Sequence, residues 1–122
     1  MAYKVLLAED NEMESSALKA IFEAEGYIID TVSNGLFALD KVKDNDYHLI
    51  ITDLVMPVSD GIQFIYSLNN LGREIPVIVI TGYDNIENML NAYQMGAIDV
   101  AYKPYDPEKL LDLCRKILEN RI

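Results

Sequence analysis

The sequence has almost no cysteine, which excludes a fold held together by disulfides. Cys114 is its one cysteine and cannot form a disulfide within the chain. Its helical spacing from Leu110, Leu111 and Ile117 predicts a small buried side chain instead. A chain of 122 residues is long enough to bury a core without disulfides. This usage of cysteine is typical of a reducing cytoplasm, where we expect the protein to reside.

Long apolar runs and basic residues are also scarce. No run approaches the roughly 20 apolar residues that a membrane-spanning helix needs, and no basic and apolar leader is recognisable at the start. Ten basic against twenty acidic residues give a formal net charge of −10. Such a charge repels phosphate backbones and anionic lipids. We therefore expect neither direct nucleic-acid binding nor membrane binding, and a DNA-binding role would need another chain or domain.

The motifs of common nucleotide-binding enzymes are missing as well. Neither G-x-G-x-x-G nor G-x-x-x-x-G-K-[ST] occurs, and the segment EDNEMES lacks the glycines that a dinucleotide site requires. His48 is the single histidine, so histidine-based catalytic triads and zinc sites are disfavoured. We expect a structural or surface role for His48.

What the sequence does contain is a regular alternation of strand and helix signals. Short runs of apolar, mostly β-branched residues predict five strands near residues 5–8, 28–32, 49–53, 77–80 and 100–102. Apolar residues at helical spacing predict a helix after each strand, and Gly26 is expected to end the first helix. This alternation favours an α/β fold with a parallel sheet covered on both faces. The first, third and fourth strands are apolar on both faces and should be central, whereas Asp30 and Thr31 indicate that the second strand lies at an edge.

Polar and charged residues stand at the carboxyl ends of the predicted strands. They are, in chain order, Glu9, Asp10, Asp53, Thr81 and Lys103. In an open parallel sheet, ligands bind at this edge. Each residue alone has an ordinary explanation, since Asp10 with Asn11 fits a helix cap and a lone lysine is usually solvated. These separate explanations do not predict that all five polar residues occur at the carboxyl ends of the predicted strands.

This set of residues fits a divalent cation and a phosphoryl group. Crowded carboxylates repel one another unless a cation neutralises them, and Mg²⁺ prefers carboxylate, carbonyl and water oxygens. Asp53 would then act as a nucleophile, because carboxylates form acyl phosphates. The metal ion and the Lys103 ammonium would neutralise the transferring phosphoryl group, while the Thr81 hydroxyl binds one of its oxygens.

Four segments contain these strand-end residues, namely VLLAEDN, ITDLVMPVSDG, VIVITGY and AYKPYDPEKL. In their order and spacing they resemble the receiver domain of two-component response regulators, the CheY-like superfamily. The resemblance covers essentially the whole chain and implies one receiver domain over residues 1–122, with no effector domain in this chain. It also implies a flavodoxin-like (βα)5 three-layer sandwich whose parallel strands follow the order 2-1-3-4-5.

The resemblance further implies a phosphoacceptor in a two-component phosphorelay. A sensor histidine kinase or a histidine phosphotransfer protein would phosphorylate Asp53. Mg²⁺, or Mn²⁺ in its place, would bind to Glu9, Asp10, Asp53 and the backbone carbonyl of Val55. Lys103 would pair with the phosphoryl group, and the peptide between it and the following proline would be cis.

Thr81 and Tyr102 form the switch that the resemblance implies. In the family, the threonine moves toward the phosphoryl group and the aromatic residue turns inward, and the segment GYDNIEN would be the mobile loop here. The output surface would comprise the fourth helix, fifth strand and fifth helix, over residues 86–122. Its partner would be a downstream effector protein or a fused output domain. A phosphorylation-dependent homodimer through the same surface is left open.

Val55 and Tyr83 occupy positions that vary among receivers and affect the lifetime of the phosphoryl group. Both are expected to flank the path of the attacking water. We therefore expect apolar Val55 and bulky Tyr83 to restrict that water and to lengthen the lifetime.

Two alternatives from other functional classes stand beside this interpretation. Haloacid-dehalogenase-like phosphatases also form an aspartyl phosphate but use D-x-D, whereas Val55 supplies no second acid after Asp53. A degenerate receiver would be a phosphorylation-independent scaffold or dimerisation module, but such members usually lack one of the five strand-end residues.

The favoured function is a signalling module that catalyses its own phosphorylation and autodephosphorylation, rather than a dedicated enzyme. The sequence identifies neither the kinase nor the target, and it leaves open whether the chain is a stand-alone regulator or part of a longer protein.

Overall fold

Five parallel strands form the central layer of the structure, a computed structural model that describes residues 2–82 and 86–119. The strands are β1 (Lys4–Ala8), β2 (Ile28–Val32), β3 (Leu49–Asp53), β4 (Val77–Thr81) and β5 (Asp99–Tyr102). Their spatial order is β2-β1-β3-β4-β5. This order reverses direction between β1 and β3, which makes their carboxyl ends the expected ligand-binding crevice. The predicted fold class and strand order are both confirmed.

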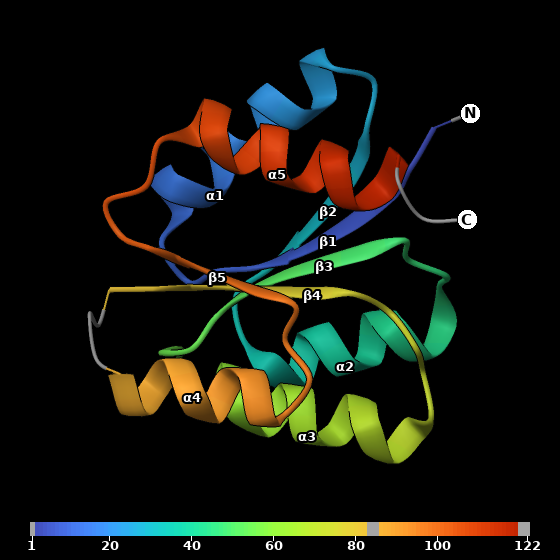
Figure 1. The fold of residues 1–122 in the computed structure, drawn as a ribbon. Coiled ribbons are helices and arrows are strands. Elements are labelled where there is room, and N and C mark those ends of the chain that lie inside the picture. Colours follow the sequence, from blue (N-terminus) through green and yellow to red (C-terminus); the bar gives the residue numbers. More distant parts are fainter. Residues whose placement is uncertain (1, 83–85, 120–122) are drawn as a thin grey trace.

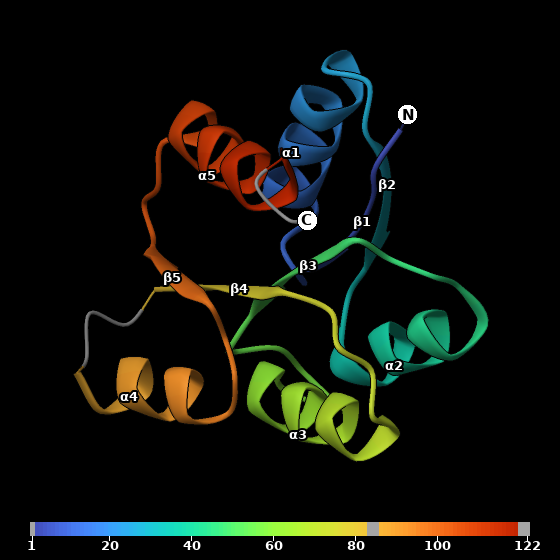
Figure 2. The same ribbon diagram turned by 45° about the vertical axis from the view of Figure 1, so that its right-hand side comes forward.

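Helices cover both faces of the sheet. They are α1 (Glu12–Ala24), α2 (Gly35–Asp44), α3 (Gly61–Leu71), α4 (Ile86–Gln94) and α5 (Pro107–Glu119). Figures 1 and 2 show α1 and α5 together on one face and α2, α3 and α4 on the other. Within the described ranges, none of the helices is long and apolar enough to cross a membrane.

The alternation of side chains along each strand divides the core into two halves. On β1, Val5 and Leu7 pack with α1 and α5, whereas Leu6 and Ala8 pack with the helices of the other face. Every residue of β3 and β4 is buried, as expected for central strands, while β2 is partly exposed at the edge. Both faces of the central strands are apolar. The polar residues at their carboxyl ends therefore lie where the strands leave the apolar core.

Local signals fix where α1 begins and ends. The Asn11 side chain accepts a hydrogen bond of 3.0 Å from the Glu14 backbone N–H, so Asn11 caps the helix. Asp10 is therefore not needed as the cap and is exposed at the carboxyl end of β1. Gly26 follows the helix with a φ of +90°, in the left-handed region that glycine adopts easily, and confirms the predicted end.

The lone histidine and the lone cysteine both have structural roles. His48 Nδ1 accepts a hydrogen bond of 2.9 Å from the Lys4 backbone N–H, and its ring packs edge-on against Tyr3. Cys114 is fully buried between α5 and the sheet. Burial raises the pKa of its thiol to about 12, so the thiol stays protonated and unreactive at neutral pH.

Gly61 allows the chain to leave the carboxyl end of β3 and begin α3. Asp60 caps α3 in a capping box with Gln63, and the next backbone N–H, that of Gly61, donates to the Leu54 carbonyl at 3.1 Å. A Cβ atom at position 61 would overlap the backbone carbonyl of Asp53 and would lie 2.9 Å from Leu54 Cα. Only glycine therefore lets α3 start this close to the site.

We predict that Gly61→Ala lowers the free energy of unfolding by about 2 kcal/mol or more, because the backbone after Asp53 must move to admit the methyl group. Urea denaturation measures this loss. Gly82→Ala is the matched control, since a Cβ atom there meets nothing within 4 Å. Its stability should stay within about 1 kcal/mol of the unsubstituted protein. Equal losses in the two variants would contradict this account of Gly61.

Candidate functional site

The carboxyl ends of the central strands surround a cavity of about 380 Å³. The residues that line it come from the ends of β1, β3, β4 and β5 and from the first turn of α1. They are Glu9, Asp10, Asn11, Glu14, Asp53, Val55, Gly82 and Lys103. The structure thus brings together four of the five predicted strand-end residues, and the fifth, Thr81, lies next to Gly82 and is fully buried.

Lys103 joins the acidic residues of this cavity. Its Nζ lies 2.7 Å from Glu9 Oε1, 2.7 Å from Asp53 Oδ2 and 2.9 Å from Glu14 Oε2. An ammonium group has three N–H donors, so these three carboxylates saturate it. The side chain of Glu9 is fully buried and that of Asp53 is 5% exposed, whereas that of Glu14 is 37% exposed. Two buried carboxyl groups therefore share one partly buried ammonium group as their hydrogen-bond donor.

Glu14 also lies at the site, although the sequence pattern around it does not predict this position. The helical periodicity of the first helix shows only that Glu14 lies off the apolar stripe. Its position in the first turn of α1, four residues after Asp10, turns it toward the Lys103 ammonium. The available signal was its spacing from Asp10, because residues at a helix amino terminus next to a strand end lie at the same edge of the sheet.

Burial and mutual contact shift the pKa values of this cluster. The pKa of Glu9 is raised to about 9, because burial first, and then hydrogen bonding to Asp53 and Glu14, outweigh the lowering by Lys103. Burial alone would lower the pKa of Lys103, but its hydrogen bonds to Asp53, Glu9 and Glu14 outweigh burial and raise it. The ammonium is thus protonated throughout the neutral range. Among the described residues that line the cavity, four carboxyl groups accompany this one ammonium.

Three of the acids lie close enough together to be compatible with a divalent cation. Glu9, Asp10 and Asp53 each offer one oxygen, and these oxygens all lie within 4.8 Å of one another. Glu9 Oε2 is buried and has no hydrogen-bond partner, which is costly unless a cation binds it. Asp53 Oδ1 is oriented by the Val55 backbone N–H at 3.0 Å, so the Val55 backbone also lies at the site. Hard oxygen donors of this kind are compatible with Mg²⁺.

The expected switch residues are neighbours across two strands. Thr81 ends β4 and is paired in register with Tyr102, which ends β5 and is partly buried. The peptide bond between Lys103 and Pro104 is cis, as expected. Tyr83, and with it residues 83–85 of the expected mobile loop, lies outside the described residues. Val55 is described and is 51% exposed beside the cavity.

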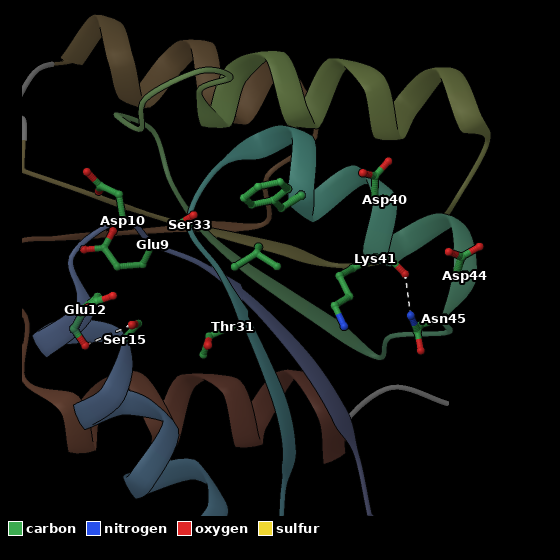
Figure 3. Close-up of a pocket in the computed structure, with 12 residues that line it drawn as sticks. Glu9, Asp10, Glu12, Ser15, Thr31, Ser33, Asp40, Lys41, Asp44 and Asn45 are labelled. Carbon is green, nitrogen blue, oxygen red and sulfur yellow. Dashed lines mark hydrogen bonds between the residues drawn. The ribbon is translucent and has the colours of Figure 1, made fainter.

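A second cavity, of about 580 Å³, opens on the other side of Glu9 and Asp10. Its remaining lining comes from the first turn of α1, the carboxyl end of β2 and the exposed face of α2, and Figure 3 shows Glu12 and Ser15 there, opposite Lys41. Neither Asp53 nor Lys103 lines this cavity. Alternate residues at the start of α1 therefore face different cavities, with Glu12 in this one and Glu14 beside Lys103.

Comparison with known proteins assigns this chain to a family. Residues 5–115 match the family model of the response regulator receiver domain. The chain belongs to this family of two-component signalling domains. The transcriptional regulatory protein HprR of Escherichia coli is 34% identical over 117 residues, which are 96% of this chain and 52% of that protein. The chain spans about half or less of the length of such curated relatives.

Solved receiver domains have the same fold as this chain. The receiver domain of Francisella response regulator 1452 superposes with a TM-score of 0.91 at 28% identity, covering 96% of this chain and 97% of that one. The chemotaxis protein CheY4 of Vibrio cholerae superposes with a TM-score of 0.90 at 26% identity, covering 97% of this receiver and all of that chain. The predicted family is therefore confirmed.

We predict that Lys103→Met lowers the free energy of unfolding by about 2 kcal/mol or more in metal-free buffer, because buried Asp53 loses its counter-charge and buried Glu9 loses a hydrogen-bond donor. Thermal or urea unfolding measures the loss. Arg73→Met is the control, since Arg73 pairs at 3.5 Å with the fully exposed Asp46. Arg73 also donates long hydrogen bonds to the Lys43 and Asn45 carbonyls, at 3.4 and 3.5 Å, and removing these weak contacts together with the ion pair should change stability by less than about 1 kcal/mol. A Lys103 variant as stable as the Arg73 variant would show that the carboxylates do not depend on the ammonium.

Proposed function

We propose that this receiver accepts a phosphoryl group on Asp53, with Mg²⁺, from the phosphohistidine of a sensor kinase or a histidine phosphotransfer protein. One observation carries the proposal: the Asp53 carboxylate ends a buried strand within 2.7 Å of the Lys103 ammonium and beside the acids of a cation site. A buried carboxylate placed between a fixed cation and a metal site is suited to nucleophilic attack on phosphorus.

In the proposed transfer, an oxygen of Asp53 attacks phosphorus as the P–N bond of the phosphohistidine breaks. The bonding electrons leave with the imidazole, and the phosphoryl oxygens keep their charge. The Val55 backbone N–H and the Lys103 ammonium hold the two Asp53 oxygens at 3.0 and 2.7 Å, so the carboxylate is oriented before the donor arrives. Mg²⁺ held by Glu9, Asp10, Asp53 and the Val55 carbonyl would neutralise charge on the transferring group. Mn²⁺ would serve as an alternative ion.

The proposed response passes from Asp53 to the output surface of α4, β5 and α5. Thr81 would bind a phosphoryl oxygen, and its register partner Tyr102 would respond at the end of β5. The apolar side chains of Leu90, Tyr93 and Ile98 are 42% to 50% exposed on α4 and just after it, which supports protein binding there. The partner would be a downstream effector or an output domain of a longer protein, and a phosphorylation-dependent homodimer through this surface is the further expectation.

Hydrolysis of the aspartyl phosphate would end the signal. Water would attack phosphorus as the bond between phosphorus and the Asp53 oxygen breaks, which would give inorganic phosphate and the free carboxylate. Half-exposed Val55 lines the cavity at Asp53, where that water would have to approach. We propose that Val55, together with Tyr83, slows this step. In this scheme the domain catalyses its own modification and demodification and is not a dedicated enzyme.

The comparisons do not support the two alternative functions. The match to the receiver family covers residues 5–115, and neither a scaffold without phosphorylation nor a dehalogenase-like phosphatase gains support from it. The intact acidic cluster beside Lys103 also favours the phosphoacceptor over the scaffold.

We predict that the unsubstituted protein gains one phosphoryl group when it is incubated with Mg²⁺ and acetyl phosphate, a small acyl-phosphate donor. Intact-mass spectrometry measures the gain. Asp53→Asn should gain none, because the amide is not a nucleophile toward phosphorus. Asp99→Asn is a control in which one acid at the start of β5, away from the cavity, loses its charge. Absence of phosphorylation in the unsubstituted protein, or retention of it in Asp53→Asn, would contradict the proposal.

We predict that Mg²⁺ raises the melting temperature of the unsubstituted protein in proportion to the logarithm of its concentration once the site is largely filled. Asp10→Asn should weaken Mg²⁺ binding about tenfold or more, because it removes one carboxylate ligand. Asp40→Asn is the matched control, an exposed acid that lines the neighbouring cavity and not the one that contains Asp53. Equal responses of the two variants to Mg²⁺ would rule out this metal site.

A further inference from the structure

We propose that Glu14 is a positioning residue that competes with the incoming phosphoryl group for the Lys103 ammonium, an inference that rests on the proposed function of Asp53. The three N–H donors of Lys103 are all occupied, by Glu9, Asp53 and Glu14. An incoming phosphoryl group can accept a hydrogen bond from Lys103 only if one of these three acceptors loses its hydrogen bond from Lys103. The structure indicates which acceptor this is.

Glu14 is the acceptor that can leave at the lowest cost. Its side chain is 37% exposed, whereas those of Glu9 and Asp53 are 0% and 5% exposed. A carboxylate that turns to water regains solvation. Buried Glu9 would instead be left without a hydrogen-bond donor, and the buried Asp53 carboxylate would keep an uncompensated charge until its bond to phosphorus forms. Glu9 and Asp53 are, in addition, needed at the cation site.

The departure of Glu14 requires only a side-chain rotation. Its backbone N–H is held by the Asn11 side chain at 3.0 Å, so the first turn of α1 need not move. The Glu14 side chain also borders a separate cavity of about 200 Å³ between α1 and the segment that joins β5 to α5. The carboxylate therefore has space to turn away from Lys103 toward solvent. No covalent bond changes in this step, because one anionic acceptor replaces another.

Glu14 thus lowers the affinity of the site for the phosphoryl group. In the unmodified protein it completes the charge pairing of Lys103, and the phosphoryl group must displace it. A chain without this carboxylate should bind the phosphoryl group, or a mimic of it, more tightly. This effect on affinity should be specific to Glu14 and should not arise from charge repulsion in general. Glu12 carries the same charge in the same helical turn but lines the other cavity (Figure 3).

The test compares Glu14→Gln with Glu12→Gln, which remove the same charge from the same turn. The probe is beryllofluoride with Mg²⁺, which mimics a phosphoryl group on a carboxylate, and its affinity is measured by NMR titration. We expect Glu14→Gln to raise the affinity about fivefold, and Glu12→Gln less than about twofold, because only Glu14 occupies Lys103. Equal effects in the two variants would overturn the proposal and leave only general electrostatics.

A second readout is independent of the metal and of modification. A double-mutant cycle between Glu14→Gln and Lys103→Met, measured by urea unfolding without Mg²⁺, should give a coupling energy that the corresponding cycle with Glu12→Gln lacks. Loss of the Glu14 coupling would refute the contact itself. If acetyl phosphate fails to modify Asp53 while the coupling is present, the proposed function is wrong, and so is the proposed competition between Glu14 and the phosphoryl group. If Asp53 is modified but the Glu14 variant behaves like its control, only the role of Glu14 fails.

Discussion

The ion-pair cluster of Lys103 is the interaction on which the site depends. It connects residues that are far apart in the chain, since Lys103 is separated by 94 residues from Glu9 and by 50 from Asp53. Buried carboxylates are expensive without a counter-charge, so this ammonium is what allows an acid to end the buried strand β3. The same cluster holds Asp53 in one orientation, and it leaves a buried oxygen of Glu9 without a hydrogen-bond partner.

The fold supplies the positions that this cluster needs. Parallel strands end at one edge, and the reversal of strand order between β1 and β3 brings Glu9, Asp10 and Asp53 together there. The absence of a side chain at Gly61 lets the chain turn directly after the site into α3. Sheet topology, a close backbone approach and one cation therefore combine to concentrate negative charge at the carboxyl edge of the sheet.

Much of this arrangement follows from the sequence, because strand and helix periods are local properties. The apolar runs predict the strands, and parallel topology then places Asp53 and Lys103 at the same edge. The role of Glu14 does not follow from the sequence, because helical periodicity shows only which residues lie off the apolar stripe and not which residues they contact. That neighbour depends on how α1 packs beside the end of β5, which is a long-range property. Likewise, Asp10 and Asn11 both fit a helix cap in the sequence, and only the hydrogen bond to Glu14 N–H identifies Asn11.

The most direct measurement of the central claim is the reactivity of Lys103 toward an amine-acylating reagent as a function of pH, read by peptide mass spectrometry. The carboxylates raise the pKa of Lys103, so its amine should remain protonated and unreactive at alkaline pH. Lys41, which is exposed on α2, is the internal reference. The account predicts that Lys103 reacts far later than Lys41 and that substitution of Asp53 and Glu14 by their amides brings the two closer. Acylation of Lys103 at the same pH and rate as Lys41 would contradict it.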